Sequence, residues 1–152
     1  MPNAIEIAVQ EDADRVMERY SNFCDTRVHR CLVEYRNLFP DFVLTLGTFN
    51  WTDYSEPKRV IVEIRLASVA EFRLYQKKRT ANSSVSDGIQ LKANPAGMVV
   101  EFGGRLRNFE SIEELRYFDY YAIGKKLEVE EMEIIGNLIV HKRPDSQDSQ
   151  KR

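Results

Sequence analysis

Ser68-Val69-Ala70-Glu71-Phe72-Arg73 recurs 43 residues later as Ser111-Ile112-Glu113-Glu114-Leu115-Arg116. In each hexapeptide a Ser stands three residues before a Glu. This spacing is typical of a capping box, in which the two side chains satisfy free backbone N–H groups at the start of a helix. Each copy also follows a stretch with the pattern of a strand hairpin. The repeat therefore predicts two helices, each preceded by two strands.

The segment 68–79 allows two interpretations. With helical periodicity, Val69, Phe72 and Tyr75 form one stripe, whereas with a period of two the preceding strand simply continues. No Gly, Pro, Asn or Asp lies between positions 60 and 79 to turn the chain. A strand of 20 residues would far exceed the usual ~3–10. We therefore predict a helix over 68–79, with a strand as the alternative.

Upstream, residues 11–39 carry apolar side chains every three or four positions, which predicts one long helix ended by Pro40. A break near Asp25-Thr26 is the alternative. Cys24 and Cys31 would then lie two helical turns apart, about 10.5 Å. That distance is too long for a disulfide, so we expect both to be reduced, as in a cytoplasmic protein.

The remaining elements follow from alternation and turn residues. Strands are expected over 42–51, 59–67, 89–93, 98–102 and about 133–142, with a turn at Asn94-Pro95-Ala96-Gly97. A third helix runs from Ser111 to Ile123 and ends at Gly124. The order is α-β-β-α-β-β-α-β, an α+β fold with a long N-terminal helix packed on a mostly antiparallel sheet. Residues 1–143 form one domain, and 144–152 form a disordered polar tail.

Composition excludes few functions. The chain has 152 residues and a net charge of −2, so there is no global attraction to nucleic acid or membrane. The charge is unevenly distributed, because residues 58–107 hold 10 basic and 4 acidic side chains, while the flanking segments are acidic. We find no signal peptide and no apolar run of the ~18–20 residues that a membrane span requires.

The sequence lacks the motifs of common catalytic and cofactor sites. Cys24, His29 and Cys31 do not have the spacing at which metal ligands converge on a helix, and no CxxC, HExxH, GxSxG or P-loop pattern occurs. We therefore predict no metal, no cofactor and no catalytic residues. Glu63 and Glu101, on two predicted strands, could face each other, which keeps an enzyme with an unrecognised carboxylate site as a hypothesis.

Two groups of residues are candidates for binding. Aromatic side chains beyond those that the predicted core needs indicate a protein interface, because Trp and Tyr are enriched there. They are Trp51, Tyr54, Tyr117, Tyr120 and Tyr121. Basic residues near aromatic ones indicate RNA or single-stranded nucleic acid. They are Arg73, Lys77, Lys78, Arg79, Arg105 and Arg107.

Three functional hypotheses follow. The first is a non-enzymatic protein-binding module (an inhibitor, an immunity-type protein or an adaptor) that acts by covering the surface of a partner protein. The second is an RNA- or single-strand-binding domain that uses residues 58–107. The third is the enzyme with an unrecognised carboxylate site. Because no catalytic groups are positioned to cooperate, the sequence favours binding over catalysis, with another protein as partner and no membrane association.

Overall fold

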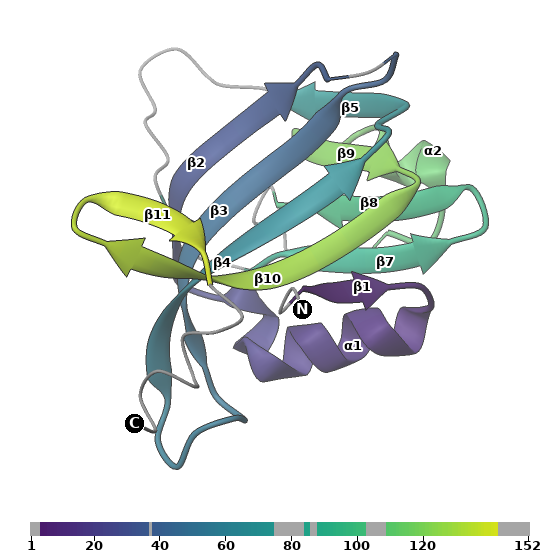
Figure 1. The fold of residues 1–152 in the computed structure, drawn as a ribbon. Helices are drawn as coiled ribbons and strands as arrows, with labels where there is room; N and C mark the ends of the chain where they lie inside the picture. Colours follow the sequence, from purple (N-terminus) through teal and green to yellow (C-terminus); the bar gives the residue numbers. More distant parts are fainter. Residues whose placement is uncertain (1–3, 37, 75–83, 86–87, 103–108, 143–152) are drawn as a thin grey trace.

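The computed structural model describes residues 4–36, 38–74, 84–85, 88–102 and 109–142, and the fold in these ranges is built mainly from two antiparallel sheets (Figure 1). The larger sheet has the path β1-β10-β4-β3-β2-β6, with β11 paired to β10. Its strands are β1 Ile5–Ile7, β2 Thr26–Glu34, β3 Asp41–Asn50, β4 Lys58–Ala67, β6 Ser84–Val85, β10 Lys126–Ile135 and β11 Leu138–His141. The smaller sheet has the order β5-β9-β8-β7. Its strands are β5 Glu71–Leu74, β7 Gln90–Asn94, β8 Gly97–Glu101 and β9 Tyr120–Gly124.

Helical structure is sparse in the described ranges. It consists of α1 Gln10–Arg19, a single 3-10 turn η1 Ser21–Phe23 and the one-turn helix α2 Ile112–Leu115. The carboxylate of Asp12 accepts the N–H groups of Ala8 and Val9, and so fixes the start of α1. The expected α+β fold with a long N-terminal helix is therefore wrong, and the molecule is mostly antiparallel β.

The long N-terminal helix fails after Arg19 because the backbone reverses there. Ser21, Asn22, Phe23 and Asp25 all have positive φ, which an α-helix does not tolerate. Residues 26–34 then form β2, which pairs antiparallel with β3. The alternative, a helix broken near Asp25-Thr26, is wrong as well, because α1 ends at Arg19 and a strand follows from Thr26. Cys24 and Cys31 are both free. They are separated by extended chain, which rises about 3.3 Å per residue, and not by two turns of a helix.

The two hexapeptides of the repeat have different structures. Ser68 has a φ of 52° and turns the chain at a corner, where its N–H donates to Asp41 Oδ1 at 3.2 Å. Residues 71–74 then form β5, so the helix predicted over 68–79 is wrong in its described part, and 75–79 lie outside the described residues. Ser111 does cap a helix through Glu114 N–H, but α2 is only one turn long, and residues 120–124 are strand β9.

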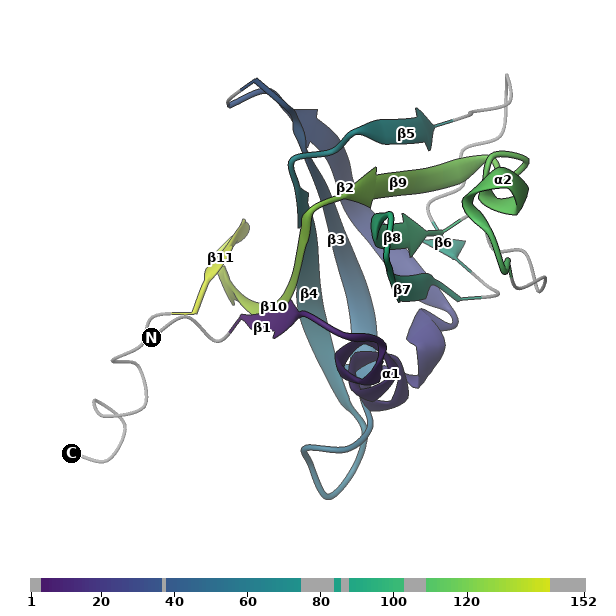
Figure 2. The same ribbon diagram turned by 90° about the vertical axis from the view of Figure 1, so that its right-hand side faces the viewer.

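The two sheets are joined by strands that bend from one into the other. β4 continues through the Ser68 corner into β5. β9, which pairs with β5, continues through Gly124 into β10, which pairs with β4. The backbones approach closely here, since a Cβ on Gly124 would lie 2.7 Å from the carbonyl oxygen of Ala67. Gly124 therefore marks this corner and not, as the sequence suggested, the end of a helix. The smaller sheet consequently stands to one side of the larger (Figure 2).

The main core lies between the sheets and is closed at one end by α1. Figure 2 shows α1 next to β7 and beneath the large sheet. Ala13 and Val16 of α1, and Tyr20 directly after it, pack with inward-facing residues of both sheets. These include Phe42, Leu44, Leu46, Val62, Ile64, Leu66, Val100, Ala122, Leu127 and Val129. A second, smaller cluster, with Phe109, Leu115 and Phe118, packs beneath α2.

Several predicted strands are confirmed. The alternation over 42–51 and 59–67 becomes the β3–β4 pair, and the predicted turn at 94–97 joins β7 to β8. The last predicted strand, about 133–142, is instead a hairpin of the end of β10 with β11. The tail 144–152 lies outside the described residues. No helix in the described part of the chain is long and apolar enough to cross a membrane.

Candidate interaction site

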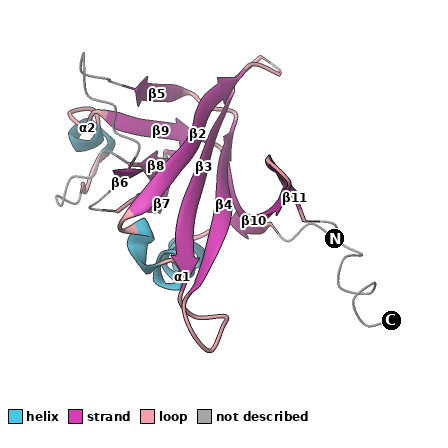
Figure 3. Cartoon of the chain, turned by 90° about the vertical axis from the view of Figure 1, so that its left-hand side faces the viewer, coloured by secondary structure: helices cyan, strands magenta, loops and turns pink. Residues whose placement is uncertain are grey.

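The end of the β3–β4 hairpin extends beyond the body of the fold (Figure 3) and carries three exposed aromatic rings. Phe49 is the last outward-facing residue of β3, and Trp51 and Tyr54 lie in the connection that follows. The Phe49 and Trp51 ring centroids are 6.4 Å apart, and Trp51 is 53% exposed. We call Phe49, Trp51 and Tyr54 the hairpin aromatic cluster.

Two cations from the start of β4 lie over this cluster. Lys58 Nζ lies 4.7 Å from the centroid of the Tyr54 ring, and the guanidinium carbon of Arg59 lies 5.9 Å from that of Phe49. The strand register causes this arrangement, because Arg59 is directly opposite Phe49. The site is therefore aromatic and cationic, with both cations exposed to solvent.

Asn50 fixes the base of the hairpin. Its side chain is fully buried, and its amide nitrogen donates to Asp53 Oδ2 at 2.9 Å and to Glu131 Oε1 at 2.7 Å. Its carbonyl oxygen accepts the backbone N–H groups of Thr52 and Asp53. One buried amide thus holds the turn that contains Trp51 and ties it to β10.

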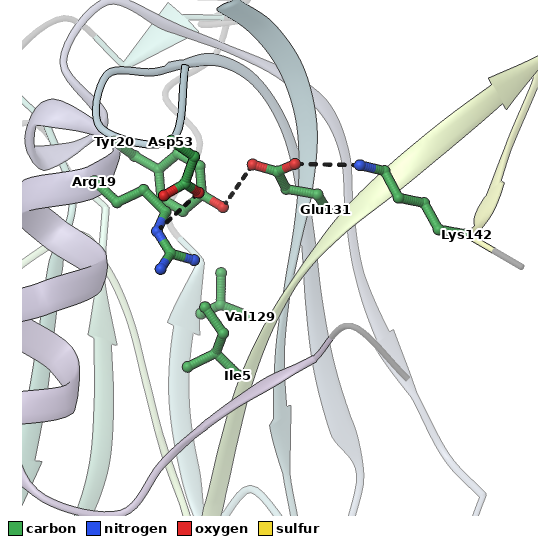
Figure 4. Close-up of a pocket in the computed structure, with 7 residues that line it drawn as sticks. All are labelled: Ile5, Arg19, Tyr20, Asp53, Val129, Glu131 and Lys142. Atoms are coloured by element: carbon green, nitrogen blue, oxygen red, sulfur yellow. Dashed lines mark hydrogen bonds and ion pairs between the residues drawn. The ribbon is translucent and has the colours of Figure 1, made fainter. Parts of the chain in front are cut away.

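The two acidic partners of this amide, Asp53 and Glu131, make further polar contacts, which Figure 4 shows. Glu131 accepts hydrogen bonds from the Tyr20 hydroxyl at 3.0 Å and from Lys142 Nζ at 3.2 Å. Arg19 Nε pairs with Asp53 at 3.4 Å, and the carbonyl of Arg19 accepts the N–H of Trp51 at 2.9 Å. The end of α1, the hairpin and β10 are therefore connected through one polar network.

A cleft of about 210 Å³ lies beside this network (Figure 4). It is lined by Arg19, Tyr20, Asp53, Glu131 and Lys142 and by the apolar side chains of Ile5 and Val129. The cleft contains two cations and two carboxylates, which pair with one another across it. Burial, and then the nearby Glu131 carboxylate, raises the pKa of Tyr20, so the phenol stays protonated and acts as a hydrogen-bond donor. These contacts hold the base of the hairpin in place.

The other predicted aromatic residues lie elsewhere. Figures 1 and 2 show α2 and β9 at the opposite end of the molecule from the β3–β4 hairpin. Tyr117, next to α2, is 78% exposed, and Tyr120 packs against Phe102 at 5.4 Å in the main core. Tyr121 is buried, and its hydroxyl donates to Glu71 at 2.7 Å. Of the five predicted residues, only Trp51 and Tyr54 lie together at an exposed site.

The basic segment is described only in part. Lys77, Lys78, Arg79, Arg105 and Arg107 lie outside the described residues. Arg73, on β5, donates to the carbonyl of Arg116 at 3.1 Å.

Two other cations of this segment are engaged within the fold. Arg65 forms ion pairs with Glu34 at 3.1 Å and Asp41 at 3.6 Å. Lys92, in the other sheet, bonds to the carbonyl of Phe109. Arg65 and Lys92 are therefore held by contacts within the fold.

The candidate acids and imidazoles do not converge. Glu63 and Glu101 are both buried but lie in different sheets. Glu63 pairs with Arg65 at 3.4 Å, and Glu101 accepts from Gln90 at 3.2 Å. His141 pairs with Glu130 at 2.8 Å on the surface. Within the described ranges, no group of three or more His, Cys, Asp or Glu side chains could hold a metal.

Sequence reasoning missed Asn50 and Glu131, which organise this site. Asn50 followed three residues later by Asp53 is typical of an Asx-stabilised turn, so a local signal for Asn50 existed. Its contact with Glu131 joins positions 81 residues apart and has no local signal. In comparisons with known proteins, the chain matches no family model, no curated protein and no solved structure.

Proposed function

We propose that this protein is a protein-binding module that contacts its partner through the hairpin aromatic cluster. The observation that carries the proposal is the exposure of three rings on one protruding hairpin whose base is fixed by a buried amide. Exposed aromatic residues that cluster in this way are characteristic of interface hot spots, where Trp and Tyr contribute most of the binding energy.

The fixed base supports this interpretation energetically. Binding normally costs about 0.5–1.5 kcal/mol for each flexible side chain that must be ordered. Here Asn50 and the Trp51 N–H bond hold the hairpin backbone before any partner arrives. The cluster therefore resembles a pre-organised binding surface, which improves affinity by lowering the ordering cost.

The charges around the cluster indicate the chemistry of the partner. Lys58 and Arg59 flank the rings and remain exposed, so a partner with an apolar pocket and an acidic rim would complement them. The two free cysteines are consistent with a reducing, cytoplasmic setting for this encounter. By covering such a pocket, the protein would act as an inhibitor, an immunity-type protein or an adaptor.

The test combines cross-linking with affinity. A photoreactive p-benzoylphenylalanine is placed at position 51 and, as a matched control, at the exposed position 117, in cells of the source organism. We expect one protein to be captured from position 51 only. With that protein purified, Trp51→Ala should weaken binding at least about 30-fold, whereas Tyr117→Ala should have little effect.

Two results would contradict the proposal. One is equal capture from positions 51 and 117, which would indicate non-specific contact. The other is that position 51 captures no protein, and that the purified chain carries a bound polynucleotide whose release depends steeply on salt. That result would favour the nucleic-acid hypothesis instead.

A further inference from the structure

The last part of β10 leaves the large sheet and pairs only with β11 among the described residues. Its final contact with β4 is Met132 opposite Ile61, and residues 133–135 continue as one strand of a two-stranded ribbon. Figure 2 shows this ribbon projecting away from the smaller sheet. An isolated two-stranded ribbon is at best marginally stable in water, so additional contacts would stabilise it.

The ribbon is apolar on both of its faces. Ile134 on one face, and Ile135 and Leu138 on the other, are about half-exposed or more, and Leu138 is 67% exposed. Solvent-facing strands usually alternate apolar with polar side chains. An exposed ribbon without that alternation is typical of a surface that another chain covers.

β11 also presents a free backbone edge. Gly136 and Asn137 form a two-residue loop, so the flanking residues Ile135 and Leu138 are a hydrogen-bonded pair. The next pair, Ile134 and Ile139, is a non-hydrogen-bonded one. By this alternation, the N–H and C=O of Ile139 point away from β10. No described strand pairs with β11 on that side, so these groups are available to a further antiparallel strand.

Three other strands in the described residues, β2, β5 and β7, have features that oppose pairing with another chain. The edge of β2 contains a bulge between Val28 and Arg30, and β5 includes two charged residues among its four. The edge of β7 is covered by α1, since Gln10 Oε1 accepts the N–H of Ala93. β11 instead begins with three consecutive aliphatic residues, 138–140.

The charges next to this edge do not oppose self-association. His141 Nδ1 lies 2.8 Å from Glu130, and Lys142 pairs with Glu131 at 3.2 Å, so the lysine charge that follows β11 is balanced within the chain. Two copies can therefore approach edge to edge without like-charge repulsion.

We propose that β11 pairs antiparallel with β11 of a second copy of this chain, about a two-fold axis at Ile139. Two-fold symmetry then places Ile139 opposite the Ile139 of the second copy and Leu138 opposite its Val140. The two outward N–H groups of Ile139 are satisfied reciprocally, and the two ribbons form one four-stranded sheet. This contact does not involve the hairpin aromatic cluster.

The test is the mass of the full chain in sedimentation equilibrium and light scattering, from micromolar to millimolar concentration. We expect a concentration-dependent species of twice the chain mass of 17.7 kDa. Ile139→Pro removes the outward N–H but no bond to β10, so it should weaken dimerisation by at least about tenfold. Leu138→Lys, at an exposed position that tolerates a charge, should weaken it similarly.

Glu133→Gln is the matched control, because it changes the ribbon on β10 and leaves the β11 edge intact. This variant should dimerise like the parent chain. Circular dichroism checks that each variant is folded. A monomer at every concentration would overturn the proposal. A dimer that neither Ile139→Pro nor Leu138→Lys weakens would do so as well.

Discussion

Asn50 Nδ2 lies 2.7 Å from Glu131 Oε1, which joins the end of β3 to β10 across 81 residues of sequence. Glu131 immediately precedes the last β10 residue that pairs with β4. One hydrogen bond therefore connects the base of the hairpin aromatic cluster to the strand from which the ribbon departs. This contact allows a direct test of how the hairpin is held.

Replacing Asn50 with Asp should destabilise the fold by about 3 kcal/mol at neutral pH. The new carboxylate would be buried beside Asp53 and Glu131, and it would lose the two hydrogen bonds that the amide donates. The loss should diminish in acid, where the repelling carboxylates become protonated. Urea unfolding at two pH values measures it.

Asn137→Asp serves as the control for this change, since Asn137 is exposed in the β10–β11 loop. It should change stability by less than about 0.5 kcal/mol. Equal effects of the two substitutions would show that the buried amide has no special role.

Trp51 is the only tryptophan, so its fluorescence reports on the hairpin alone. Because the ring is half-exposed on a fixed backbone, acrylamide should quench it readily, while its anisotropy should decay at the rate of the whole folded molecule. Time-resolved anisotropy measures this decay. A dominant fast component in the nanosecond range would argue against pre-organisation of the cluster.

Stability should fall in acid, in part through Glu71. The Arg116 guanidinium, and then the Tyr121 hydroxyl, hold the pKa of this carboxyl below its ordinary value of 4.5. Since the folded pKa is lower than the unfolded one, the ionised form is stabilised above the ordinary pKa, and this contribution is lost as the pH falls through the folded pKa.

Glu71→Gln should therefore show a smaller decrease in melting temperature than the parent chain between about pH 5 and about pH 3. Glu18→Gln, at an exposed position on α1, is the control and should follow the parent curve. A parent-like acid response in Glu71→Gln would disprove the role of this carboxyl.

The corner between the sheets should be sensitive to one methyl group. Gly124→Ala would place a Cβ 2.7 Å from the Ala67 carbonyl and 2.8 Å from Leu66 Cγ, and should cost about 1–3 kcal/mol. Gly136→Ala meets no atom within 4 Å, and its positive φ of 62° alone should cost about 1–2 kcal/mol. The denaturant midpoints of the two variants, compared at an unchanged m-value, measure these losses of stability.

A different substitution at each glycine, to Asn, distinguishes a steric clash from the cost of a positive φ. Gly136→Asn should recover part of the loss, because Asn tolerates a positive φ, whereas Gly124→Asn should be worse than Gly124→Ala. If both positions respond alike, the close approach at Gly124 is not what limits that site.

The sequence predicted the elements whose local pattern agrees with their tertiary environment. β3 and β4 alternate because one face of each lies against the core, and this pattern is visible without a structure. The reversal after Arg19 was not predictable, since Ser21, Asn22 and Phe23 adopt positive φ without a glycine. The corner at Ser68 was missed for the same reason, and pairing with β9 outweighed the local helical pattern.

The candidate site was predictable to a similar extent. Trp51 and Tyr54 are predicted because they are aromatic residues beyond those that the predicted core needs. Tyr120 and Tyr121 have the same composition signal, but strand β9 directs them toward packed surroundings. Which aromatic residues stay exposed depends on long-range strand pairing, and no local pattern contains that information.

The pairing of β1 with β10 has a consequence for biosynthesis. Ile5 lies opposite Val129, so β1 must wait for β10, which is synthesised after β2, β3 and β4, before it can dock. The large sheet therefore cannot be completed until β10 has left the ribosome, and until then the nascent chain keeps an open strand edge at β4.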